Sequence, residues 1–300
     1  MINLSIVDIK ELTKIINNKI ILEDITLRID GNTVILGRNG AGKSTLLKCI
    51  AGIYKAESGS VRVFDKDPYT SKEVREHIGY MPDYYSLYDD LSVTDNLNFF
   101  RSLYKESLED KQIRSIIEKL ELNKYLNLKV GQLSRGTKQK ASFIRAIQIK
   151  PKLMLLDEPT AFLDPISANT LRDIIDSYCR ANRSTYIYVT QRVEEVSLMD
   201  ADIVVIENGR VKRRVKREDL SRSLEDSFDI RLAKPISDNL IVTLKKADYI
   251  EHIKKISDRV IRVKLSSYKS IKRLIGLIVD NNYVISSISS IYDLLDDSDE

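Results

Sequence analysis

The sequence between residues 37 and 45 reads Gly37-Arg38-Asn39-Gly40-Ala41-Gly42-Lys43-Ser44-Thr45 and matches the pattern GxxxxGK[ST] in full. It lies directly between a β-rich run, Thr33 to Leu36, and a helical pattern, which is the context that a phosphate-binding loop requires. Glycines let backbone N–H groups surround phosphate oxygens, and the following helix directs its positive end at the same anion. We expect Lys43 to contact the β- and γ-phosphates of a nucleotide and Ser44 to ligate Mg²⁺. The residues predicted to bind the nucleotide are Arg38, Asn39, Gly40, Ala41, Gly42, Lys43, Ser44 and Thr45.

A second candidate site is a pair of carboxylates at the end of the apolar run Lys152-Leu153-Met154-Leu155-Leu156-Asp157-Glu158-Pro159. The run predicts a buried strand. Asp157 would hold Mg²⁺ through water, and Glu158 would polarise the water that attacks the phosphate. Two acids at a strand end are also compatible with an ordinary solvated terminus, but the upstream phosphate loop favours the metal site.

The third motif is Leu133-Ser134-Arg135-Gly136-Thr137, which Lys138-Gln139-Lys140 and a helical pattern follow. It resembles the LSGGQ signature of the ABC (ATP-binding cassette) family and, as in that family, precedes the strand with the two acids. Residues 1 to about 215 resemble a complete ABC nucleotide-binding domain, with Asp164 at the D-loop position. The resemblance implies an α/β fold of the P-loop NTPase class, ABC ATPase type, in which a parallel sheet carries an antiparallel β part and an inserted helical subdomain.

The same resemblance implies the ligands and partners. ATP and Mg²⁺ would be bound, and two subunits would form a head-to-tail dimer with two ATP molecules at its interface. The phosphate loop of one subunit would face the signature of the other, because a short hydroxyl and glycine amides at a helix N-terminus suit a γ-phosphate. A separate integral membrane permease would use the energy of hydrolysis. The signature residues expected to act in trans are Ser134, Arg135, Gly136 and Thr137.

The pattern of apolar residues predicts how the chain is divided. Residues 1–215 alternate β-rich runs with helical patterns, but strands disappear at about 84–150, where three- and four-residue spacing predicts an inserted helical subdomain. Residues 216–300 predict a small α+β domain, with strands near 228–232, 259–265 and 283–288 and a helix near 268–279. This appendix, which ends in Ile291-Tyr292-Asp293-Leu294-Leu295 and an acidic tail, is similar to the C-terminal extension of ATPases that serve ABC-2-type exporters.

Three positions depart from the family pattern. Ile16 stands where an aromatic residue commonly stacks on adenine, and Asp83 stands where a glutamine senses Mg²⁺ and the γ-phosphate; a carboxylate there can still bind metal-bound water. Gln191 replaces the switch histidine, so this position can donate a hydrogen bond but cannot carry a positive charge. We therefore expect a slow ATPase, with Glu158, Lys43 and Gln191 as the catalytic residues.

Tyr84, Tyr85 and Tyr88, which follow Asp83, are candidates either for contacting the membrane partner or for packing under the helical subdomain.

Composition limits the location and the partners. The net charge of +4 over 300 residues is too small to indicate nucleic-acid binding. No apolar run reaches the roughly 20 residues that span a bilayer, and the N-terminus lacks a secretory pattern, so we expect a cytoplasmic protein that is peripheral on the inner face of the cell membrane. The cysteines, Cys49 and Cys179, are expected to be reduced core residues.

Two functions remain open at this point. One is an ATPase that drives a membrane permease for export, as one half of a homodimer or a heterodimer. The other is a nucleotide-gated binding or regulatory module with negligible hydrolysis, paired with a different ABC subunit. A third class, DNA-maintenance or translation-associated ABC proteins, is disfavoured because the chain has one cassette and no heptad-length insertion.

Overall fold

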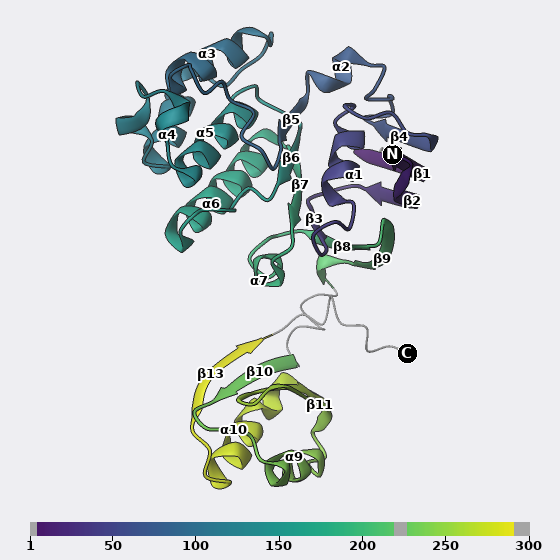
Figure 1. Ribbon diagram of the computed structural model, residues 1–300, viewed down its shortest axis with the longest axis vertical. Helices are drawn as coiled ribbons and strands as arrows, with labels where there is room; N and C mark the ends of the chain where they lie inside the picture. Colours follow the sequence, from purple (N-terminus) through teal and green to yellow (C-terminus); the bar gives the residue numbers. More distant parts are fainter. Residues whose placement is uncertain (1–4, 219–226, 291–300) are drawn as a thin grey trace. The chain divides into compact units, whose positions relative to one another are not determined.

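The computed structural model describes residues 5–218 and 227–290, which fall into two compact units divided between Arg214 and Val215. The centre of the first unit is a six-stranded sheet with the order β5-β6-β7-β3-β8-β9. β3 pairs in parallel with β7 and β8, and β6 pairs in parallel with β5 and β7. Every residue of β3, β6 and β7 is buried, because other elements cover both faces of the sheet (Figure 1). The strands are β3 (Thr33–Leu36), β5 (Ile78–Met81), β6 (Leu153–Asp157), β7 (Thr185–Thr190), β8 (Asp202–Glu207) and β9 (Arg210–Val215).

A second sheet in this unit is antiparallel and has the order β2-β1-β4, formed by β1 (Val7–Ile16), β2 (Lys19–Ile29) and β4 (Ser58–Val63). Helix α1 (Lys43–Ile50) contacts both sheets, and its apolar face joins them in one core. Of these three strands, the apolar pattern of the sequence predicts only one near residues 4–9, which overlaps the start of β1 at Val7. The remainder of β1 and its partner β2 could not be predicted, because the pairing of these strands contains register shifts. Glu11 and Asp24 have positive φ of 51° and 52° and interrupt the alternation of apolar side chains.

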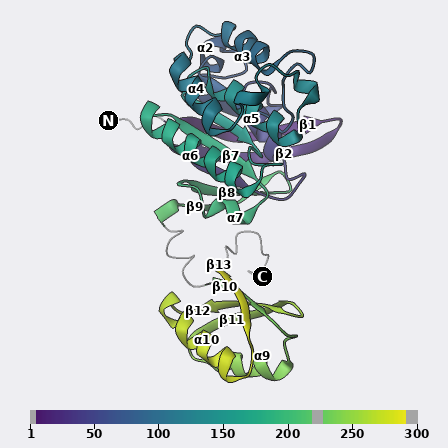
Figure 2. The ribbon, with the colours of Figure 1, turned by 90° about the vertical axis from the view of Figure 1, so that its left-hand side faces the viewer.

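Helices α3 (Val93–Ser102), α4 (Asp110–Lys119) and α5 (Arg135–Ile147) follow between β5 and β6, and no strand is assigned in this described stretch. Together with α6 (Pro165–Asn182) they lie on the opposite side of the six-stranded sheet from α1 (Figures 1 and 2). Ser92 and Ser134 cap α3 and α5 by accepting a hydrogen bond from a backbone N–H three residues on. The shorter elements are α2 (Lys72–Arg75), α7 (Val193–Val196), η1 (Asn123–Tyr125) and η2 (Val130–Gln132).

Over residues 227–290, the second unit has the element order β-α-β-β-α-β, and the four strands there lie in the antiparallel order β11-β12-β10-β13, the ferredoxin-like arrangement. The three predicted strands and the predicted helix are present, although the last strand begins at Ile285 rather than Tyr283. Helix α9 and strand β11 were not predicted. The predicted segment 291–295 and the acidic tail lie outside the described residues. The elements are β10 (Ser227–Leu232), α9 (Asp238–Lys245), β11 (Ile250–Ser257), β12 (Val260–Leu265), η3 (Tyr268–Ser270), α10 (Ile271–Asp280) and β13 (Ile285–Ser290).

Two expectations from composition can be compared with the structure. Cys49 and Cys179 are free, buried thiols, as predicted, and burial raises the pKa of each to about 12. Among the described residues, no helix combines the length and the apolar character that a membrane crossing needs.

Candidate functional site

The phosphate loop connects the end of β3 to the start of α1. Gly42 has a φ of 98°, and a Cβ on it would lie 2.9 Å from the backbone oxygen of Ile21, so only glycine fits there. The Lys43 ammonium folds back over the loop and donates to the carbonyls of Gly37 at 2.8 Å and Arg38 at 2.9 Å. Burial lowers the pKa of Lys43, and the nearby carboxylates of Glu158 and Asp157 oppose that shift. The loop therefore holds a buried cation beside two acids.

The two acids lie at the end of β6, as predicted. Asp157 is fully buried, and neither of its carboxylate oxygens has a hydrogen-bond partner among the described residues. Burial raises the pKa of Asp157 to about 6; the Ser44 hydroxyl, which lies nearby without reaching hydrogen-bond geometry, lowers it, and the charge of Asp83 raises it further. Burial likewise raises the pKa of Glu158 to about 7. Buried acceptors without partners indicate that a further polar group belongs here.

The backbone of Glu158 is fixed on both sides. Its φ is 48°, a left-handed conformation that is unusual for a residue with a long side chain. Its N–H donates to the carbonyl of Val189 at 3.0 Å, which ties it to β7. Its carbonyl accepts from the Gln139 side chain at 2.8 Å and from the Ala161 N–H at 3.0 Å. A strained residue that is held in this way points to a functional constraint.

The signature residues contact the D-loop rather than the phosphate loop. Ser134 caps α5, and its hydroxyl lies 2.7 Å from that of Thr137. A Cβ on Gly136 would lie 2.7 Å from the backbone oxygen of Phe162, and the Arg135 guanidinium lies 5.2 Å from the centre of the Phe162 ring. No hydrogen bond or ion pair among the described residues joins these four positions to Lys43 or its loop. The structure thus gathers the predicted residues into two groups on one chain.

Three of the remaining predicted positions, Asp164, Asp83 and Gln191, lie near these groups. Asp164 accepts from the N–H of Ser167 at 2.9 Å and so caps α6. Asp83 is exposed, and its charge acts on Asp157. The backbone N–H of Gln191, rather than its exposed side chain, lies near the Glu158 carboxylate and lowers its pKa. Ile16 is half-buried at the end of β1.

Sequence reasoning missed the residues that hold these groups in place. Gln139 was quoted only as part of the signature, although its side chain is buried and reaches Glu158. Glu195 looked the same as its neighbour Glu194, since nothing in the sequence around them distinguishes a buried acid from an exposed one. The structure shows Glu195 as 2% exposed and surrounded by hydroxyl groups.

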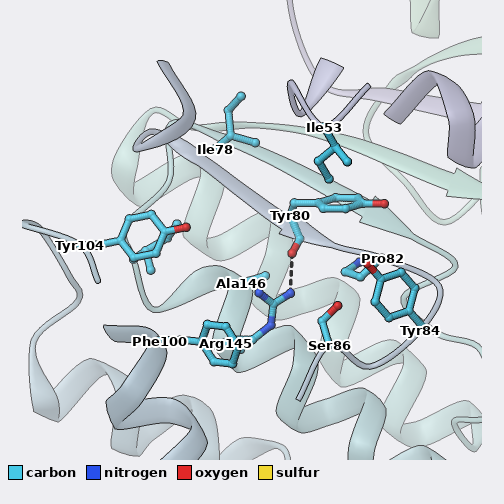
Figure 3. A pocket seen from close by; sticks show the side chains of 11 residues that line it. Ile53, Ile78, Tyr80, Pro82, Tyr84, Ser86, Phe100, Tyr104, Arg145 and Ala146 are labelled. Carbon is cyan, nitrogen blue, oxygen red and sulfur yellow. Dashed lines mark hydrogen bonds between the residues drawn. The ribbon is translucent and has the colours of Figure 1, made fainter. Parts of the chain in front are cut away.

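A cavity of about 190 Å³ lies between the end of β5, α3 and α5 (Figure 3). Arg145 forms part of its wall: its guanidinium donates to the carbonyl of Tyr80 at 2.6 Å and lies 5.1 Å from the centre of the Phe100 ring. Burial lowers the pKa of Arg145, and its Nε and the Tyr80 hydroxyl have no hydrogen-bond partner among the described residues. Tyr84 and Tyr104 also line the cavity, with Tyr84 57% exposed.

Known proteins resemble the chain over most of its length. The ABC transporter family model matches residues 22–161. The uncharacterized ABC transporter ATP-binding protein MJ1023 of Methanocaldococcus jannaschii is 30% identical over 252 residues, which cover 81% of this chain and 92% of that protein. YcbN of Bacillus subtilis, with the same description, is 27% identical over 295 residues, or 97% of this chain and 95% of YcbN. The molybdate/tungstate import ATP-binding protein WtpC of Archaeoglobus fulgidus is 33% identical over 62% of this chain and 78% of WtpC.

Solved structures agree with the fold. The ATP-binding cassette MJ0796, a dimer in a post-hydrolysis state bound to ADP and Pi, has a TM-score of 0.62 at 24% identity and covers 70% of this chain and 98% of that one. CbiO1 of Clostridium perfringens, described as part of an ABC transporter complex, has a TM-score of 0.61 at 26% identity and covers 73% of this chain and 91% of that one. The predicted P-loop NTPase fold of the ABC type is thus confirmed. Since MJ1023 is matched at 30% identity over 92% of its length, the chain belongs to the ABC transporter ATP-binding proteins and is an ATPase.

Proposed function

We propose that this chain is the motor subunit of an ABC exporter: it hydrolyses ATP at a Glu158-based site and drives a separate membrane permease. The observation that carries the proposal is the placement of Glu158. Its carboxylate lies in the field of Lys43, its pKa is raised to about 7 by burial, and its backbone is fixed by Val189 and Gln139. A base with a pKa near the working pH can accept a proton from water in the transition state.

The phosphate loop supplies the other groups of the site. Lys43 would exchange its two bonds to loop carbonyls for the β- and γ-phosphates of ATP. Ser44 and Asp157 would hold Mg²⁺, with Asp83 reaching it through water; the unpartnered oxygens of Asp157 fit this role, since Mg²⁺ is usually held by one or two carboxylates, water and substrate phosphates. Mg²⁺, when bound, neutralises charge on the phosphate oxygens. Gln191 would add an uncharged hydrogen bond to the γ-phosphate.

Two subunits complete the site. ABC ATPases dimerise, and we propose a head-to-tail dimer here because the signature residues of one chain lie with Phe162, apart from its own phosphate loop. Ser134 and Gly136, at the N-terminus of the 13-residue helix α5, would meet the γ-phosphate held by the partner subunit. Arg135, Thr137 and Asp164 would lie in the same interface. A second copy of this chain as the partner would give a homodimer, and a different ABC subunit would give a heterodimer.

ATP turnover by the purified chain tests the proposal directly. We expect slow phosphate release that requires Mg²⁺, together with a shift from monomer to dimer on addition of ATP, measured by light scattering after size exclusion. Binding of ATP with no turnover under the same conditions would favour the second candidate, a nucleotide-gated regulatory module. The substitution of the switch histidine by Gln191 is the observation that favours that candidate.

We further propose that the cavity beside Arg145 receives the membrane permease, which would hold the chain at the inner face of the membrane. Its wall combines the partly exposed Tyr84 with the half-buried guanidinium of Arg145, as at interfaces where tyrosine and arginine are enriched. Tyr88 adds to the neighbouring surface, 51% exposed and packed edge-on against Phe99 at 5.4 Å.

Site-specific crosslinking tests this docking site. A photo-reactive residue in place of Tyr84 should capture an integral membrane protein in membranes of the source organism, whereas one in place of Ser60, exposed on β4, should not. Equal capture at both positions, or capture from neither, would contradict the proposed site.

The direction of transport is proposed as export. WtpC, named as an import protein, matches 62% of this chain, whereas YcbN matches 97% and so includes most of the second unit. The second unit resembles the extension of ABC-2-type ATPases in length and pattern. Identification of the permease captured at Tyr84 tests the direction, because an importer-type permease would contradict it.

A further inference from the structure

A buried carboxylate, Glu195 on α7, lies behind the hydrolytic site. Its side chain is 2% exposed and accepts hydrogen bonds from three hydroxyl groups. Thr160 donates at 2.5 Å, Thr190 at 2.9 Å and Tyr188 at 3.0 Å. The Tyr188 and Thr160 hydroxyls also lie 2.9 Å apart. Each of these three hydroxyl-bearing residues is at most 1% exposed, so the carboxylate and its donors form one closed network.

Two arginines balance the charge of this network. Arg172 on α6 lies 3.5 Å from a Glu195 oxygen, and Arg192 lies 3.3 Å from the same oxygen. Arg172 is itself 7% exposed. Burying ions is costly unless they are paired and hydrogen-bonded, and apolar residues of similar volume often fill such a space at no loss of stability. The cost of this arrangement therefore suggests a role beyond packing.

The network joins the two loops that reach the phosphate site. Thr160 comes two residues after Glu158, and Thr190 comes directly before Gln191. The Thr190 hydroxyl also accepts from the Arg192 N–H at 3.0 Å, which fixes the turn around Gln191. That turn matters to the base, because the Glu158 N–H donates to the Val189 carbonyl at 3.0 Å, two residues before Gln191, and the nearby Gln191 backbone lowers the pKa of the Glu158 carboxyl. One carboxylate thus holds both the chain that follows the base and the chain to which the backbone of the base is hydrogen-bonded.

We propose that Glu195 is a positioning residue for ATP hydrolysis: by binding Thr160 and Thr190 together, it sets the distance between the Glu158 loop and the Gln191 loop. The inference rests on the proposed role of Glu158. It predicts that loss of the Glu195 carboxylate slows the hydrolytic step while ATP still binds, since no hydrogen bond or ion pair among the described residues joins the phosphate loop to this network.

The neighbouring acid provides a matched control. Glu194 is on the same short helix, but its side chain is 68% exposed and its ion pair is with Arg192 alone, at 3.1 Å. We expect Glu195→Gln to lower kcat about 10–100-fold, the size of effect that misplacement of a catalytic group produces, with KM for ATP changed less than about threefold. Glu194→Gln should leave both constants unchanged. Equal kinetics of the two variants would overturn the proposal.

Threonine variants keep the test decisive if Glu195→Gln does not fold. Thr160→Val and Thr190→Val each remove one hydroxyl and keep the charged groups. Each of these variants should lower kcat and leave KM for ATP unchanged. Thr160→Ser and Thr190→Ser keep the hydroxyl and should have the parental kcat. Thermal unfolding is measured alongside. If the valine variants lose stability but keep kcat, the network is only structural and the proposal fails. Glu158→Gln in the same assay distinguishes failure of the proposed base from failure of the proposed network. If the Glu158→Gln enzyme still hydrolyses ATP, the assignment of Glu158 as the base is wrong, whereas the role of Glu195 is judged from the Glu195 and threonine variants.

Discussion

Replacing Glu158 by glutamine should abolish most ATP turnover and leave ATP binding intact. The amide keeps the volume and the acceptor oxygen but cannot take a proton, and a general base contributes about 10²–10⁴-fold to a rate. We therefore expect kcat to fall at least about 100-fold. Since hydrolysis is what would loosen the ATP-bound dimer, the variant should remain dimeric with ATP and Mg²⁺ for longer than the parent. Phosphate release and size-exclusion chromatography measure the two effects.

A control variant makes this result specific. Glu194→Gln removes an acid from the surface of the same unit and should hydrolyse ATP at the parental rate. If Glu158→Gln also hydrolyses at that rate, another group activates the water, and our assignment of the base is wrong.

Replacing Gly42 by alanine should weaken nucleotide binding strongly. The residue has a φ of 98°, and a Cβ would lie 2.9 Å from the Ile21 backbone oxygen and 2.7 Å from the Leu22 side chain. The loop cannot shift to relieve these contacts without moving Lys43, because Lys43 is the next residue and the start of α1. Overpacking of this kind costs about 1–3 kcal/mol. A loss of that size corresponds to roughly a tenfold to hundredfold weaker ATP affinity, which titration calorimetry measures.

Gly40→Ala is the matched control, because Gly40 also has a positive φ, 80°, but a Cβ there would meet nothing within 4 Å. The ATP affinity of the Gly40→Ala variant therefore measures the effect of backbone strain without an added steric contact. We expect Gly42→Ala to bind ATP at least about tenfold more weakly than Gly40→Ala. Equal affinities would show that strain, rather than the contact with Ile21, limits the loop.

Part of the fold and of the site could be predicted from the sequence because the residues involved are neighbours in the chain. The phosphate loop, the two acids and the signature are contiguous, and each lies at a strand end or helix start that hydrophobic patterning reveals. Fold class and family could be predicted for that reason. The family resemblance implied an antiparallel β part, but apolar patterning did not reveal most of its strands, since bulges at Glu11 and Asp24 interrupt the period of two.

What the sequence could not show is which polar residues are buried together. Glu194 and Glu195 are adjacent and chemically equivalent in the sequence, yet the fold exposes one and surrounds the other with hydroxyl groups from β7 and the segment after β6. Gln139 reaches Glu158 across 19 positions of sequence. The sequence by itself determined the family, the nucleotide loop and the acids at the end of β6, because those depend on neighbouring residues. Only the tertiary structure decided what holds Glu158 and Gln191 in place, because burial and hydrogen bonding between distant segments depend on how the chain packs.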